Sequence, residues 1–134
     1  MYAHREDATD HARYRAWLED LLASGQSFGI VDLVLSGFIR IVTHPRIFRE
    51  PTPLDMALTF AGEIRDRPNC VAVNPGKRHW SIFGQLCLTS GAKGNLVPDA
   101  WLAAIAIESG SEWVTTDRDY ARFPGLRWRH PIER

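Results

Sequence analysis

Residues 98–109, PDAWLAAIAIES, restrict the fold more than any other segment, because this stretch is almost entirely apolar. A helix that is apolar on all sides must be buried among other elements. Pro98 suits the first helical position, which places Asp99 in the first turn. We therefore expect a buried helix that starts with a carboxylate. Such a group is unfavourable there unless it is paired, hydrogen-bonded or bound to metal.

Short apolar segments alternate with amphipathic ones along the rest of the chain. We expect helices over residues 9–25, 32–44, 52–65, 79–90 and 98–109, and strands over residues 28–30, 70–73, 112–116 and 126–128. This alternation is typical of a parallel sheet covered by helices on both faces. Ligands of such sheets bind beyond the carboxyl ends of the strands, so acidic residues at those ends are candidates for a site.

Composition and charge restrict the class of protein. With 134 residues, of which 45% are hydrophobic and 24% charged, we expect one soluble domain over residues 1–134. The net charge of zero gives no support for non-specific binding to nucleic acid or membranes. Cys70 and Cys87 stand in apolar surroundings, which indicates buried thiols in a reducing compartment. The sequence contains no signal peptide or membrane-spanning run, so we expect a cytoplasmic protein.

Two further carboxylates follow the strand expected at residues 112–116. Taken singly, Asp117 and Asp119 could be turn or capping residues, and Asp99 could serve the helix dipole. Together they would repel one another, and a divalent cation would relieve that repulsion. Carboxylate oxygens suit Mg²⁺ or Mn²⁺ better than zinc. We therefore regard Asp99 and Asp117 as candidate metal ligands, with Asp119 as an auxiliary.

Other segments leave alternatives open. Asp32 follows the strand expected at residues 28–30, where it could be an N-cap or an auxiliary ligand. The segments KRHW (77–80) and RFPGLRWRH (122–130) could stack on single-stranded RNA, or could be packing residues separated by solvated arginines. The spacing of the five histidines does not fit a zinc hydrolase, and the chain has no P-loop and no G-x-S-x-G motif.

Three stretches together resemble a known family: MYAHREDATDHARYRAWLE, VLSGFIRIVTHPRIF and GNLVPDAWLAAIAIESGSEWVTTDRDYARFPGLRW. They are similar to PIN-domain toxins of the VapC family, most closely a mycobacterial-type branch. The resemblance implies a PIN-like three-layer α/β/α fold. It also implies a Mg²⁺- or Mn²⁺-dependent endoribonuclease, forming a homodimer and silenced by a VapB antitoxin. Asp99 and Asp117 then match two of the family's metal-binding acids.

Two departures from the family pattern bear on the site. The family's acid on the helix after the second strand would fall near Gly37, where this chain has none, and Asp32 is the carboxylate expected to compensate. The family's first strand, which ends in another metal-binding Asp, has no counterpart here, since Met1–His4 resembles only its tail. We expect that the functional protein starts about ten residues upstream. A truncated, inactive domain is the alternative.

The functional hypotheses differ in a measurable way. The first is a metal-dependent endoribonuclease toxin, and the second is an inactive PIN-like domain that binds an antitoxin or RNA without cleaving it. A phosphoryl-transfer domain is a third and weaker hypothesis, because no D-x-D-x-T motif is present. Neither the RNA target nor the antitoxin follows from the sequence.

Overall fold

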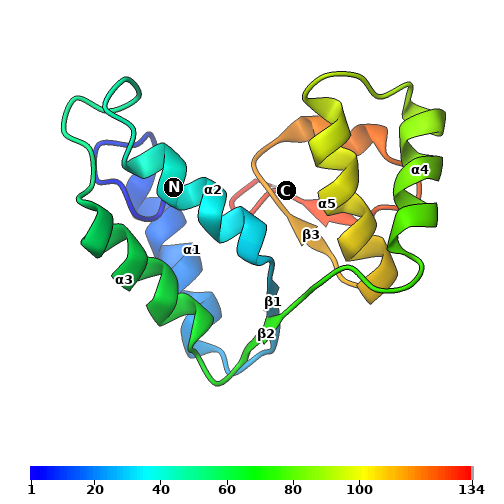
Figure 1. Cartoon of the computed structure of the whole chain (residues 1–134). Helices are drawn as coiled ribbons and strands as arrows, with labels where there is room; N and C mark the ends of the chain where they lie inside the picture. Colours follow the sequence, from blue (N-terminus) through cyan, green and yellow to red (C-terminus); the bar gives the residue numbers. More distant parts are fainter. Residues whose placement is uncertain (134) are drawn as a thin grey trace. The chain divides into compact units, whose positions relative to one another are not determined.

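The computed structural model describes residues 1–133. The chain forms two compact units, Met1–Val73 and Asn74–Arg134, each with helices packed beside a pair of short parallel strands (Figure 1). No described helix is long and apolar enough to cross a membrane.

The first unit contains three helices and one strand pair. Its elements are α1 (His11–Ala23), β1 (Phe28–Ile30), α2 (Asp32–Val42), α3 (Leu54–Arg65) and β2 (Cys70–Ala72). Strands β1 and β2 are parallel, with Phe28 opposite Cys70 and Ile30 opposite Ala72. Helices α2 and α3 pack together and connect these two strands in the chain, which is the crossover that parallel strands require.

Small residues and aromatic rings form the interior of the first unit. Ala57 and Ala61 of α3 are buried, which lets this helix approach its neighbours closely, and Val42 ends α2 fully buried. The His4 ring lies edge-on to Phe38 of α2 and Phe60 of α3, at centroid distances of 5.2 and 4.6 Å. Residues near the N-terminus therefore take part in the packing of α2 and α3.

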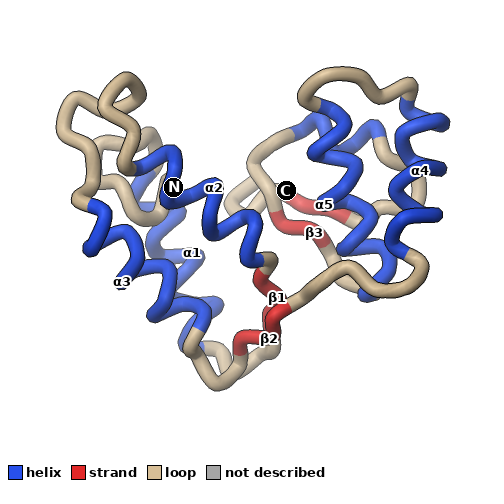
Figure 2. The backbone as a smooth tube through the Cα atoms, in the orientation of Figure 1, coloured by secondary structure: helices blue, strands red, loops and turns tan. Residues whose placement is uncertain are grey.

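The second unit contains the buried helix expected from the sequence. Its elements are α4 (His79–Ser90), α5 (Leu96–Ser109), β3 (Trp113–Val114), the 3₁₀ helix η1 (Arg118–Arg122) and β4 (Trp128–Arg129). Strands β3 and β4 are parallel, with Trp113 opposite Trp128 (Figure 2). The connection between them runs through η1.

Helix α5 is the centre of the second unit. Its alanines Ala100, Ala103 and Ala104 are fully buried and form one core cluster with Leu86 of α4 and with two aromatic residues that follow β3. Those residues are Tyr120 and Phe123. Because alanine adds little bulk, α4 packs closely along α5, while the rings fill the space on the η1 side.

The α/β class and the parallel strands expected from the sequence are confirmed, with differences in detail. The described strands form two separate pairs, β1–β2 and β3–β4. Helix α5 begins at Leu96, two residues before the expected start, so Pro98 is its third residue. Proline is tolerated there because the first four N–H groups of a helix have no intrahelical acceptor. Asp99 nevertheless lies in the first turn, as expected.

Gly29 in the middle of β1 is fixed by close packing. A Cβ at this position would lie 2.7 Å from Cγ2 of Val73, a contact that real side chains essentially never make. Valine is stiff at χ1 and cannot easily turn away. Gly62 of α3 is a suitable comparison, since a Cβ there would meet nothing within 4 Å.

We predict that Gly29→Ala destabilises the protein by about 1–3 kcal/mol, the usual effect of overpacking. The matched change Gly62→Ala should stabilise it by about 0.5–1 kcal/mol, because alanine favours the helix. Urea denaturation of both variants measures these differences. Equal stability of Gly29→Ala and the parent chain would show that β1 and Val73 can separate freely.

Candidate active site

Asp99 is placed by the start of helix α5. Its side chain is half-buried at the edge of the alanine-lined core, and the hydroxyl of Tyr120 donates a hydrogen bond to its Oδ1 at 3.3 Å. No other side chain of the described residues makes a hydrogen bond to this carboxylate. The helix N-terminus favours negative charge at this position, whereas the partial burial opposes it.

Asp117 and Asp119 are placed by the turn after β3. Asp117 is the N-cap of η1, and its Oδ1 accepts a hydrogen bond from the backbone N–H of Asp119 at 2.9 Å. The Asp117 N–H donates to Oγ1 of Thr115 at 3.1 Å. Both carboxylates are exposed, and both belong to the same short element that buries Tyr120 against α5.

The three carboxylates are close enough to affect one another. Burial is the first cause that raises the pKa of Asp99, and the charge of Asp117 is the second. The hydrogen bond from Tyr120 opposes these effects, and the charge of Asp119 adds to them. Burial and the neighbouring Asp99 in turn raise the pKa of the Tyr120 hydroxyl. The site therefore gathers more negative charge than its own groups neutralise.

The chemistry of these residues fits a hard divalent cation. The site offers carboxylate oxygens, and a bound cation would neutralise the repulsion between Asp99 and Asp117. The described residues contain no cluster of three or more His, Cys, Asp or Glu side chains arranged for a metal. Mg²⁺ commonly uses one or two carboxylates, with water and substrate phosphate completing its shell, so a pair of acids is compatible with it.

Asp32 does not join the other carboxylates but forms an ion pair with Arg65. It lies in the first turn of α2, in the first unit, and Arg65 of α3 holds both of its oxygens at 2.8 and 3.2 Å. This hydrogen bond lowers the pKa of Asp32, the opposite of the shift at Asp99. The contacts therefore favour an ion pair between α2 and α3. The auxiliary metal-binding role stays a prediction.

The basic and aromatic segment 122–130 mostly serves the fold. Phe123 is buried in the core of the second unit, and Leu126 and Trp128 pack against it. Arg129 pairs with Glu112 at 2.7 Å, while Arg127 donates to the backbone oxygen of Gly110. Packing residues separated by surface arginines are therefore the better interpretation of segment 122–130.

Sequence reasoning missed two residues. Tyr120 was expected only as part of a motif, yet it is 4% exposed and makes the hydrogen bond to Asp99. Glu108 near the end of α5 was not singled out as a site residue, yet its two oxygens accept the backbone N–H groups of Gly76 and Arg78 at 2.7 and 2.9 Å. The only signal for either was a polar group next to apolar core residues.

Comparison with known proteins assigns the family. A sequence profile of the PIN domain matches residues 1–126. Ribonuclease VapC43 of Mycobacterium tuberculosis H37Rv is 44% identical over 133 residues, which cover 99% of this chain and 90% of that protein. Ribonuclease VapC31 of the same strain is 40% identical over 131 residues, which cover 98% and 92%.

This chain belongs to the VapC family of PIN-domain proteins.

A solved structure supports the same fold for this VapC protein. The crystal structure of VapBC2 from Rickettsia felis, bound to a DNA fragment from its promoter, matches 96% of this chain and 90% of the compared chain, with a TM-score of 0.65. The sequence identity of 20% means that this likeness concerns the fold alone. The resemblance identified from the three sequence stretches is thus confirmed, and so is the α/β fold it implied.

The raised pKa of Asp99 makes the folding stability of this VapC protein depend on pH. A carboxyl group with a higher pKa in the folded state binds its proton more tightly there. The stability it contributes is therefore present below its ordinary pKa of 3.8 and is lost as the pH rises through the raised value. At neutral pH, without metal, the ionised Asp99 destabilises the fold.

We predict that Asp99→Asn raises the melting temperature of the metal-free protein by a few degrees at pH 7, and that the difference shrinks toward pH 4. Calorimetry in chelator between pH 4 and 8 measures this. Asp20→Asn, on the exposed face of α1, serves as the control without such a pH-dependent gain. A loss of stability at pH 7 in Asp99→Asn would mean that the carboxylate is a net structural contact.

Proposed function

We propose that the chain is the toxin of a VapBC-type toxin–antitoxin module and cleaves RNA as a divalent-metal-dependent endoribonuclease. The observation that supports this most is the gathering of Asp99 and Asp117 at one end of α5, where burial first and the charge of Asp117 second raise the pKa of Asp99. The relatives named ribonuclease, at 40–44% identity over nearly the whole chain, support the substrate class. A toxin of this kind acts in the cytoplasm, where its RNA lies.

The residues have separable tasks in the proposed reaction. Asp99 and Asp117 would hold Mg²⁺ or Mn²⁺, with Asp119 as an exposed auxiliary. When bound, the cation supplies positive charge for phosphate oxygens and lowers the pKa of a coordinated water. The backbone N–H of Asp119 keeps Asp117 oriented, at 2.9 Å, before any ligand arrives. Such preorganisation avoids rearrangement during the reaction.

A second function has one observation in its favour. Because the described residues hold no group of three or more potential metal ligands, a domain that binds RNA or antitoxin without cleaving is also consistent with the site. The two functions differ in metal-dependent cleavage, and they also differ in thermal stabilisation by Mn²⁺, which only an occupied site provides.

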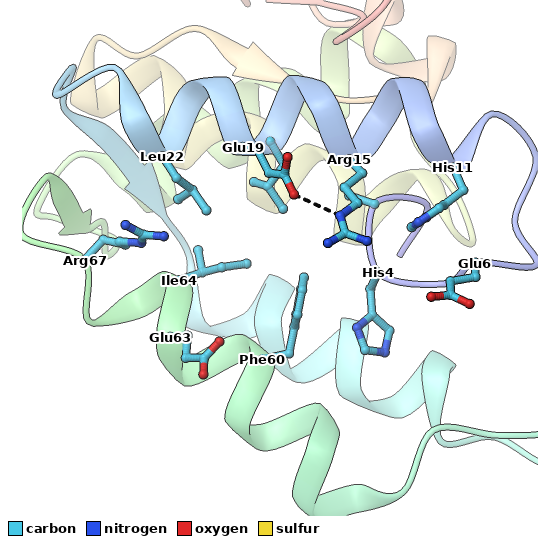
Figure 3. A pocket seen from close by; sticks show the side chains of 12 residues that line it. His4, Glu6, His11, Arg15, Glu19, Leu22, Phe60, Glu63, Ile64 and Arg67 are labelled. Carbon is cyan, nitrogen blue, oxygen red and sulfur yellow. Dashed lines mark hydrogen bonds and ion pairs between the residues drawn. The ribbon is translucent and has the colours of Figure 1, made fainter.

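The antitoxin partner is supported by a cavity in the first unit. The cavity has a volume of about 330 Å³ and lies between α1 and α3 (Figure 3). Leu22, Phe60 and Ile64 point into it, while Arg15 and Glu19 form an ion pair at 2.9 Å on its α1 side. An apolar interior edged by charged side chains suits an amphipathic segment of a partner protein.

Self-association is supported by the outer face of α4. Trp80 and Leu88 are 72% and 81% exposed, large values for apolar side chains, and Gly84 lies midway between them in sequence. The spacing 80, 84, 88 is symmetric, so two antiparallel copies of α4 would set each Trp80 against the other copy's Leu88. This face carries no charge to repel a second copy. We propose that it joins two copies of the chain.

The ribonuclease proposal predicts that Asp99→Asn and Asp117→Asn each reduce RNA cleavage at least about a hundredfold, because each removes a charge that holds the cation. Cleavage of a labelled single-stranded RNA with Mn²⁺, with and without chelator, measures this. Asp20→Asn should cleave like the parent chain. Cleavage by the parent that survives chelator would remove the metal from the mechanism, and cleavage that persists in Asp99→Asn would remove Asp99 from it.

The homodimer proposal predicts that Leu88→Lys weakens self-association at least about tenfold, since it places a charge in an apolar contact. Sedimentation of the parent and variant across a concentration range provides the measurement. Leu58→Lys is the matched control, because Leu58 is 52% exposed on α3, in the other unit. A parent chain that stays monomeric, or a variant that dimerises equally well, would contradict the proposal.

A further inference from the structure

The hydroxyl of Tyr120 is a polar group in the core of the second unit. The residue is 4% exposed, and its ring belongs to the cluster formed by α4, α5 and η1. Phenylalanine would fill the same volume without a hydroxyl to bury. A buried hydroxyl without a partner is unfavourable, so its hydrogen bond to Oδ1 of Asp99, at 3.3 Å, is needed.

Packing holds the Tyr120 ring on two sides. Its centroid lies 5.5 Å from that of Trp113 in β3 and 5.9 Å from that of Phe123. The ring therefore has little freedom to turn away from α5. Because η1 starts directly after Asp117, the element that presents Asp117 also fixes the position of Tyr120.

The indole of Trp113 explains the direction of the hydroxyl. The Trp113 Nε1–H is buried and has no hydrogen-bond partner of standard geometry among the described residues. It lies close enough to the Tyr120 hydroxyl to lower the pKa of that group. A donor facing the hydroxyl oxygen disfavours turning the O–H toward Trp113, which leaves Asp99 as its acceptor.

We propose that Tyr120 is a positioning residue for Asp99: its hydroxyl, backed by the Trp113 indole, occupies Oδ1 and reserves Oδ2 for a divalent cation. This inference rests on the proposed metal-dependent function. A carboxylate that rotates freely must lose that freedom when it binds metal, whereas one already held by a hydrogen bond does not. Asp117 is held in the same way, through its own Oδ1, by the backbone of Asp119.

The test compares Mn²⁺ binding to Tyr120→Phe and to the parent chain, by electron paramagnetic resonance of free Mn²⁺. We expect the dissociation constant to rise about 10–100-fold, the usual result of removing an outer hydrogen bond to a metal ligand. Asp99→Asn should lose binding altogether. Tyr14→Phe, which removes a hydroxyl from α1 in the other unit, should bind like the parent. Circular dichroism confirms that each variant is folded.

A second readout needs no metal. In the metal-free protein, Tyr120→Phe should shift the NMR resonance of the Trp113 Nε1–H, because the indole loses the oxygen it faces. A shifted resonance with weaker Mn²⁺ binding supports the inference. Unchanged Mn²⁺ binding in Tyr120→Phe overturns it, while the loss in Asp99→Asn would leave the ribonuclease proposal standing. A parent chain that binds no Mn²⁺ would overturn both.

Discussion

The packing of α5 against α4 and η1 is the contact on which the second unit depends. Its alanines allow close approach on one side, and Tyr120 and Phe123 close the other side. The first turn of the same helix carries Asp99, so the carboxylate is anchored to the most buried element of the unit. Rigid support of this kind keeps a reactive group within a narrow range of positions, which a loop cannot do.

Electrostatics at the site oppose the stability that α5 provides. A half-buried Asp99 close to the charge of Asp117 raises the free energy of the folded state at neutral pH. The chain offsets part of this through the Tyr120 hydrogen bond and the helix N-terminus. Uncompensated charge of this type is common where a protein is shaped for a ligand, because the ligand completes the charge balance.

Sequence alone predicted the helices and the parallel direction of the strands well, because apolar spacing is a local signal, but it expected one sheet where the described strands form two separate pairs. It also predicted that Asp99 and Asp117 would both serve one site, from their places at the start of a buried helix and after a strand. It could not predict that Arg65 holds Asp32, because that contact joins residues 33 positions apart. The roles of Tyr120 and Glu108 were missed for the same reason, since each depends on a contact with residues more than 20 positions away in the chain.

The contact between Glu108 and Gly76 couples the loop before α4 to the end of α5. The carboxylate ties the loop before α4 to the end of α5, and a Cβ on residue 76 would lie 2.7 Å from its Oε2. A side chain at 76 therefore requires the glutamate to leave, and without the glutamate two backbone N–H groups lose their acceptor. In this chain, the residue at 76 and the residue at 108 are therefore coupled, and a change at one alters the contacts of the other.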